Sequence, residues 1–322
     1  MKESSIPAAA FLGTILDTYR DSAVALVGCR SRGAGRYSCE YDVLVVTGDR
    51  RPRTTFKVGD SFVDLFFSTE REALNPANPE LALSLAMAKP LRDSSLILST
   101  SSAANLATVS GLARKASERR LASALKIIGR SEAALGKGSV IDADFWLLAA
   151  SYELAYALLL SSETLPSPSH LLSQLREPKR RINGFEGFSI GTGLEAASRA
   201  GCGARLEGIT VLHDLFREGK AESFDSDWPK ARTELLSAKA QELVTRMELA
   251  ECYSFLGQEL VDAMVRLMKK NPRRTIATLT AGKDQLIGER LTRQLGLART
   301  EEAIKAGLAV VKSQASSFAR SG

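Results

Sequence analysis

The stretch VGCRSRGAGRYSCEYDVLVV, from Val27 to Val46, changes character half-way along its length. Its first half is rich in glycine, arginine and serine, a composition typical of loops and turns. Its second half ends in an apolar, β-branched run, which indicates a buried strand. Two carboxylates, Glu40 and Asp42, stand at the start of that strand with one residue between them. Any fold that buries this strand must therefore hold two like charges at its beginning.

The glycines of the loop fit neither of the two common phosphate-binding motifs. A P-loop would end in Gly-Lys followed by Ser or Thr, and the run GAGRYS lacks the third glycine of a dinucleotide fingerprint. Both motifs also need a helix that begins directly after the loop, whereas EYDVLVV is too β-branched to be that helix. A Rossmann-type or P-loop nucleotide site is therefore excluded at this position.

The two carboxylates indicate a metal site instead. Side chains alternate between the faces of a sheet along a strand, so Glu40 and Asp42 should point the same way. Two unpaired anions this close repel each other, and a divalent cation such as Mg²⁺, which prefers carboxylate oxygens, would compensate them. The alternative interpretation is that both residues belong to a polar strand end that faces solvent.

A third carboxylate, Asp64, interrupts the apolar run SFVDLFFS at residues 61–68. An ionised aspartate among phenylalanine, valine and leucine is costly unless it is paired or binds a metal. If this run and the strand that follows Glu40 are neighbours in the sheet, three carboxylates converge. Such a set can hold two Mg²⁺ or Mn²⁺ ions and support an in-line phosphoryl or nucleotidyl transfer.

Short apolar runs and longer helical patterns divide the chain into a mixed N-terminal part and a helical remainder. Four short runs predict strands, with a hairpin between the last two. These runs are residues 23–28, 41–46, 54–59 and 61–68. Residues 100–218 have helical patterns, and the very apolar segment 145–160 predicts a central, well-covered helix. The last zone predicts further helices, beginning with one long helix over residues 228–270 that bends near Gly257.

The predicted fold class is α+β, a small mixed β-sheet with flanking helices followed by all-α helical bundles. A chain of 322 residues is long enough for two or three modules that each bury a core. We predict three domains: an α/β domain at residues 1–98, a helical bundle at 99–220 and a C-terminal helical region at 221–322.

Composition and charge are those of an ordinary soluble globular protein, with 44% apolar and 25% charged residues. The net charge of +6 permits a polyanionic partner such as a nucleotide or nucleic acid. The four cysteines lack metal-ligand spacing, which favours a reduced, cytoplasmic compartment. The two histidines lie far apart in the sequence and favour neither a zinc site nor a catalytic triad. Neither a signal peptide nor an apolar run of roughly 18 residues is evident, so we expect no membrane contact.

Taken together, these residues resemble the nucleotidyltransferase superfamily with a DNA polymerase β-type palm, in its small bacterial and archaeal form. In that family a strand is followed by Gly-Ser, a short turn that often contains Arg-Gly, and Ser-Asp-x-Asp before an apolar strand. A third Asp follows on a later strand. Here Gly28-Cys29 corresponds to Gly-Ser and Arg32-Gly33 to the turn. Cys39-Glu40-Tyr41-Asp42 corresponds to Ser-Asp-x-Asp, and Asp64 to the third acid. The helices beyond residue 100 are similar only in type to the helical second domain of antibiotic nucleotidyltransferases.

This resemblance implies a nucleotidyltransferase domain at residues 1–98. The implied enzyme moves a nucleoside monophosphate from a nucleoside triphosphate, with ATP the expected donor, to a hydroxyl of an unknown acceptor. That acceptor is a small molecule, an RNA or a protein, and a homodimer is left open. Glu40, Asp42 and Asp64 would be the catalytic residues and the ligands of Mg²⁺ or Mn²⁺. Residues of the loop would bind the nucleotide, namely Gly28, Cys29, Arg32 and Ser38.

Two departures from the family pattern keep a second interpretation open. Cys29 replaces the serine that usually contacts the triphosphate, and a thiol is a weaker hydrogen-bond donor than a hydroxyl. Glu40 replaces the first aspartate, which keeps the charge but adds a methylene group and shifts the metal position. The alternative is therefore a catalytically degenerate nucleotidyltransferase fold that binds a nucleotide, an RNA or a partner protein as a regulatory module.

Overall fold

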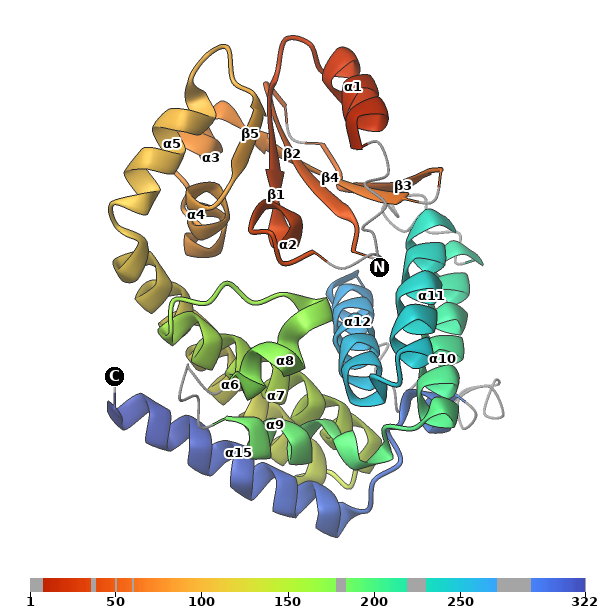
Figure 1. The fold of residues 1–322 in the computed structure, drawn as a ribbon. Helices are drawn as coiled ribbons and strands as arrows, with labels where there is room; N and C mark the ends of the chain where they lie inside the picture. The colour runs from red at the N-terminus through yellow and green to blue at the C-terminus, as the bar shows by residue number, and fades with distance from the viewer. Residues whose placement is uncertain are drawn as a thin grey trace. The chain divides into compact units, whose positions relative to one another are not determined.

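The computed structural model describes residues 8–35, 39–49, 51–59, 61–177, 184–218, 230–270 and 291–321 (Figure 1). The chain divides into two compact units. The first consists of Met1–Leu112 and Ser223–Leu235, and the second of Ala113–Glu222 and Leu236–Gly322. The predicted division into three domains stays a prediction.

A five-stranded mixed sheet forms the centre of the first unit (Figure 1). Its strands are β1 (Ala23–Val27), β2 (Tyr41–Thr47), β3 (Thr54–Val58), β4 (Ser61–Thr69) and β5 (Lys89–Arg92), in the order β3-β4-β2-β1-β5. The β2–β4 pair is parallel and the other pairs are antiparallel. The four predicted strands and the β3–β4 hairpin are thus confirmed. The strand β5 was not predicted from the sequence, because this edge strand has only four residues and includes Pro90.

The two faces of the sheet are covered by different helices. Alternate residues of the strands pack on one face against α1 (Ala8–Thr18), through partly buried Leu12 and Leu16. The other face contributes Ala25, Leu44 and Val46 to a second apolar cluster. Three helices cover that second face: α3 (Glu70–Leu74), α4 (Pro79–Ala86) and α5 (Ile97–Leu106). Because each inner strand buries both faces, the middle of β2 is a continuous apolar run.

The described remainder of the chain is helical, which confirms the predicted α+β class. Its helices are α6 (Val109–Gly136), α7 (Val140–Ser161), α8 (Leu171–Arg176), α9 (Phe185–Thr192), α10 (Arg199–Glu218), α11 (Lys230–Thr245), α12 (Leu249–Lys270) and α15 (Glu301–Ser321). Two short 3-10 helices, η1 (Pro168–His170) and η3 (Leu194–Ala196), lie between them. By length and composition α7 could span a membrane, but 83% of its most apolar window is buried inside the structure, as in the core helix of a soluble protein.

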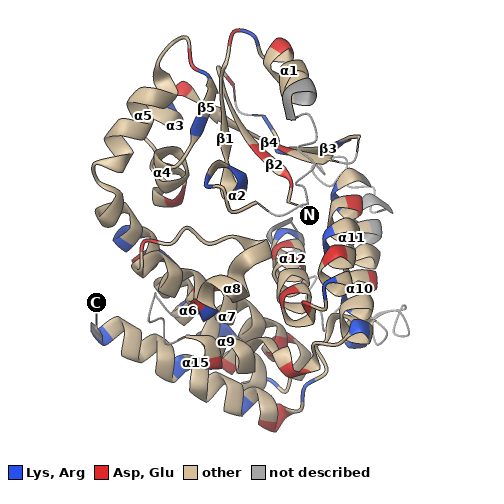
Figure 2. Cartoon of the chain, viewed as in Figure 1, with Lys and Arg blue, Asp and Glu red and all other residues tan. Residues whose placement is uncertain are grey.

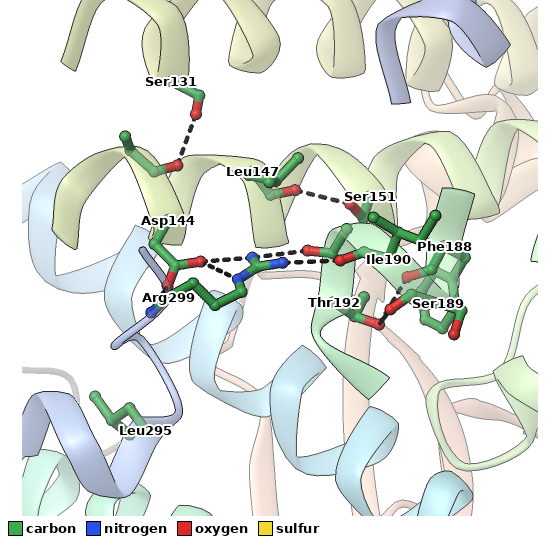
Figure 3. A network of polar contacts seen from close by, with 12 residues as sticks. Ser131, Asp144, Leu147, Ser151, Phe188, Ser189, Ile190, Thr192, Leu295 and Arg299 are labelled. Carbon is green, nitrogen blue, oxygen red and sulfur yellow. Dashed lines mark hydrogen bonds and ion pairs between the residues drawn. The ribbon is translucent and has the colours of Figure 1, made fainter. Parts of the chain in front are cut away.

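A buried ion pair joins three segments of the second unit (Figure 3). Asp144 of α7 is fully buried, and its Oδ1 accepts from Arg299 Nε at 2.7 Å. The backbone N–H of Arg299 donates to Asp144 Oδ2 at 3.1 Å. The two remaining guanidinium nitrogens donate to the carbonyls of Ile190 and Gly191, at 2.8 and 3.0 Å. One arginine just before α15 therefore holds the C-terminal part of α9 against α7.

The long helix predicted over residues 228–270 is wrong, because it is interrupted where α11 ends and α12 begins. The break lies at Met247, whose φ of 61° is left-handed, and the N–H of Glu248 donates to the Leu243 carbonyl at 2.9 Å. Glycine usually takes this position, so the sequence carries no visible stop signal. Gly257 lies inside α12 and is required by packing, since a Cβ there would meet Tyr152 Oη at 2.4 Å.

Candidate functional site

The register of the sheet brings the three predicted acids together. Asp42 of β2 lies opposite Asp64 of the parallel strand β4, and on its other side opposite Val27 of β1. Glu40 directly precedes β2. One carboxylate oxygen from each of the three acids lies within 4.8 Å of the others. Figure 2 shows acidic residues on β2 and β4 and basic residues on the short helix α2 (Gly28–Ser31).

Gly28 lies directly against the acid cluster, at the point where β1 gives way to α2. Its φ is +74°, a left-handed conformation that glycine adopts without strain. A Cβ at this position would stand 2.1 Å from Oδ2 of Asp42. The backbone can therefore approach the carboxylate only because residue 28 has no side chain, which places this predicted nucleotide-binding residue at the acids.

Two arginines of the loop donate hydrogen bonds to backbone carbonyls of the same loop. Arg30 donates from Nε and Nη2 to the carbonyl of Cys39, at 2.9 and 2.5 Å, and its guanidinium lies 4.1 Å from the ring centroid of Tyr41. It thereby ties α2 to the residues just before β2. Arg32, a predicted nucleotide-binding residue, donates from Nε to the Gly28 carbonyl at 3.1 Å. Ser38, another predicted nucleotide-binding residue, lies outside the described residues.

The thiol of Cys29 is buried and faces a second thiol. Its sulfur lies within 4.8 Å of the sulfur of Cys39, which is also buried. The hydrogen bond with Cys39, burial, and the carboxylates of Asp42 and Glu40 together raise the pKa of Cys29 well above its usual value. Cys29 is therefore a neutral thiol, and Cys39 is its hydrogen-bonding partner.

Asp64 is fully buried, and hydrogen bonds from three residues reach its two oxygens. Arg53 and Arg232 both donate to Oδ2, the latter at 3.1 Å, and the hydroxyl of Thr55 donates to Oδ1. Thr55 lies opposite Asp64 in the β3–β4 hairpin, so the register of the hairpin could have predicted this contact. Arg232 belongs to α11 and lies 168 residues away in sequence, and no sequence signal pointed to it.

A divalent ion bound by all three acids of the cluster would have to change the contacts of Asp64. Glu40 and Asp42 are partly exposed and offer the hard oxygen ligands that Mg²⁺ prefers. Asp64 carries the charge needed to complete a three-carboxylate set, but both of its oxygens already accept hydrogen bonds. A metal ion at Asp64 must therefore displace at least one of these donors.

Replacing Gly28 by alanine should destabilise the protein more than the same change at Gly33. Both glycines have a left-handed φ, which costs an alanine about 1–2 kcal/mol. A Cβ at Gly33 would meet nothing within 4 Å, whereas one at Gly28 would overlap the Asp42 carboxylate. We expect Gly28→Ala to lose roughly 1–3 kcal/mol more than Gly33→Ala in urea denaturation. Equal losses would mean that Asp42 turns away at no cost, and would contradict a fixed position for its carboxylate.

No protein-family model matches the chain, and no curated protein matches it. Among solved structures, a nucleotidyltransferase-like protein from Exiguobacterium sibiricum 255-15 is similar, with 14% sequence identity and a TM-score of 0.33. The alignment covers 88% of this chain and 86% of that chain. Likeness at this level does not establish a shared activity.

Proposed function

We propose that the chain is a metal-dependent nucleotidyltransferase that moves a nucleoside monophosphate from a nucleoside triphosphate, ATP being the expected donor, to a hydroxyl of an unidentified acceptor. One observation carries the proposal. Two carboxylates from the adjoining strands β2 and β4, and a third from the residue just before β2, bring their oxygens within 4.8 Å of one another. Beside them the backbone at Gly28 approaches Asp42 without a side chain. Two-metal phosphoryl and nucleotidyl transfer needs a compact set of hard oxygen ligands next to space for a phosphate chain.

In this proposal Glu40 and Asp42 hold the divalent ion, and the backbone around Gly28 receives the phosphates. Bound there, Mg²⁺ would neutralise charge on the transferred phosphate and acidify the attacking hydroxyl. Arg30 and Arg32 keep the loop backbone in place by their hydrogen bonds to main-chain carbonyls. Asp64 would become a ligand only if Arg53 or Arg232 left it, and the freed guanidinium could then bind a phosphate oxygen.

A specific observation favours a second candidate, a degenerate fold that binds a nucleotide, an RNA or a protein without transfer. Two guanidinium groups and a hydroxyl already satisfy Asp64, so its charge is balanced without a metal. If those contacts persist when a nucleotide binds, only Glu40 and Asp42 remain as metal ligands. A site with one ion can bind a nucleotide yet lack the second ion that activates the acceptor.

Replacing Asp42 by asparagine should abolish transfer while leaving the fold intact. The change keeps the shape of the side chain and removes one negative charge, so we expect unchanged or slightly higher stability without metal. Wild-type and Asp42→Asn proteins are incubated with cell extract, Mg²⁺ or Mn²⁺ and each of the four triphosphates carrying an α-phosphate label. The wild type alone should produce a labelled product, because only it keeps the full set of ligands.

A thermal melt of the same two proteins separates the two candidates. A ligand that binds only the folded state raises the melting temperature, so Mg²⁺-ATP should stabilise the wild type and not Asp42→Asn. A Mg²⁺-dependent shift without any labelled product supports the degenerate fold. If the wild type shows no shift, or the variant shifts equally, Asp42 is not a metal ligand and the transferase proposal loses its basis.

A further inference from the structure

The helix α6, together with the residue that follows it, carries an unusual share of the positive charge of the protein. Residues 109–137 contain seven basic and two acidic side chains, which give a net charge of +5, against +6 for the whole chain. The basic residues are Arg114, Lys115, Arg119, Arg120, Lys126, Arg130 and Lys137. By contrast, α10 and α12 each contain as many acidic as basic residues. The charge of the chain is therefore concentrated on one helix.

Contacts with neighbouring helices decide which side of α6 faces solvent. Ser117 is buried and donates to the Ala157 carbonyl of α7 at 2.8 Å. Ser131, near the other end of the helix, is also buried and donates to the Ala143 carbonyl at 2.6 Å. A lysine of α15 pairs with Glu132. Packing on α7 and α15 thus fixes the rotation of α6 about its own axis.

The opposite side of α6 presents a row of cations, which we call the basic ridge. Its members are Lys115, Arg119, Lys126, Arg130 and Lys137. At about 100° per residue, all five directions fall within a sector of about 60°, and both acids of the segment lie outside that sector. All five side chains are exposed. The packing of α6 therefore leaves its cations on a surface that a polyanion can reach.

Three lysines of the ridge have no counterion within the described ranges of the chain. These are Lys115, Lys126 and Lys137. The guanidinium of Arg130 lies 4.9 Å from the ring centroid of Trp146 on α7, which fixes its position without neutralising its charge. The ridge is therefore not a set of surface salt bridges.

The spacing of the ridge matches that of the two strands of duplex DNA. Eleven residues separate Lys115 from Lys126, Arg119 from Arg130, and Lys126 from Lys137. Eleven residues of helix rise about 16.5 Å. One turn of duplex DNA is about 34 Å long and contains both strands, so a line along its surface crosses a backbone every 17 Å or so on average. The flexible stems of lysine and arginine can absorb the unequal widths of the two grooves.

The residues beside the ridge favour a duplex over a single strand or a membrane. The exposed positions among the cations are small: Ala122, Gly129, Ala133 and Gly136. A Cβ at Gly129 or Gly136 would meet no atom within 4 Å, so a wide rod can approach the helix closely. Single strands bind by stacking bases on aromatic side chains, and amphipathic helices bind membranes by inserting apolar ones. These exposed positions offer neither.

We propose that the basic ridge of α6 binds the phosphate backbone of duplex DNA without reading its base sequence. The cations contact phosphate oxygens, which position a protein on DNA but carry no sequence information. The proposal is independent of the nucleotidyl transfer proposed above, because no residue of the ridge belongs to the acid cluster.

The test is fluorescence anisotropy of a labelled DNA duplex of about 20 base pairs with the full chain. The buffer contains a metal chelator and no nucleoside triphosphate. If each of the five cations displaces one counterion, the logarithm of the binding constant falls with the logarithm of salt concentration at a slope of about −4.5. A fourfold rise in salt should then weaken binding about 500-fold. Duplexes of unrelated sequence should bind equally well.

A double variant, Lys115→Gln with Lys126→Gln, removes two cations of the ridge. Both side chains are exposed and have no counterion among the described residues, so the fold should be kept, as circular dichroism can check. The slope should fall to about −2.7, and a fourfold rise in salt should weaken binding only about 40-fold. The matched control is Arg114→Gln with Arg320→Gln, two exposed cations outside the ridge. It loses the same net charge and should keep the wild-type slope.

Four results would overturn the proposal. The first is an absence of salt-dependent binding to the duplex. The second is an equal loss in the two double variants, which would mean that overall charge, not the ridge, attracts DNA. The third is tighter binding to the separated single strand, and the fourth is binding to phosphatidylserine vesicles without binding to the duplex. None of these results bears on the acid cluster, since the assay contains neither metal nor triphosphate.

Discussion

Replacing Arg299 by alanine should lower the free energy of unfolding by about 3–5 kcal/mol. The substitution leaves Asp144, whose side chain is 1% exposed, as a buried charge without its ion-pair partner. It also removes the donors that hold the Ile190 and Gly191 carbonyls, so α9 loses its attachment to α7 (Figure 3). Urea denaturation followed by circular dichroism measures the loss.

The matched control for this prediction is Lys312→Ala. Lys312 pairs with Glu132, but the two side chains are 56% and 45% exposed. An exposed pair contributes at most about 1 kcal/mol, because water screens both charges. If Arg299→Ala is no more destabilising than Lys312→Ala, the Asp144–Arg299 pair does not hold the second unit together.

Replacing Asp64 by asparagine should destabilise the metal-free protein by about 2–3 kcal/mol. Asp64 is the counterion of Arg53 and Arg232, and without its charge the two guanidinium groups repel each other beside a buried amide. Arg53 is 34% exposed and can turn toward solvent, which keeps the loss below that for Arg299→Ala. Thermal denaturation in a metal chelator measures the effect.

The stability of Asp64→Asn is compared with that of Asp42→Asn, the same substitution at the neighbouring acid. Both substitutions remove one negative charge from the same cluster, yet Asp42→Asn should be neutral or slightly stabilising without metal. Opposite signs would show that Asp64 has a structural ion-pair role in addition to any metal binding. Two variants that both gain stability would contradict the arginine contacts, since relief of repulsion among the acids would then dominate at both positions.

The sequence was sufficient to predict the three acids of the candidate site but not the cations around them. Asp42 lies at the start of one strand with Glu40 just before it, and Asp64 interrupts another strand, so each acid is visible as a charge at or in an apolar run. Their convergence required only that the two strands pair, and β2 and β4 do so in parallel register. The contact between Thr55 and Asp64 could be predicted in the same way, because the register of the hairpin places the two residues opposite each other.

What the sequence by itself determined is the α+β class, four of the five strands, and the place of the acids along them. These follow from local rules, because side-chain alternation and turn chemistry depend on residues close together in the chain. Only the tertiary structure decided that Arg232 reaches Asp64 and that Arg299 reaches Asp144, across separations of 168 and 155 residues. It also decided that a methionine, not a glycine, ends α11. Such contacts depend on which surfaces packing brings together, and an arginine carries the same charge whether it faces solvent or a buried carboxylate.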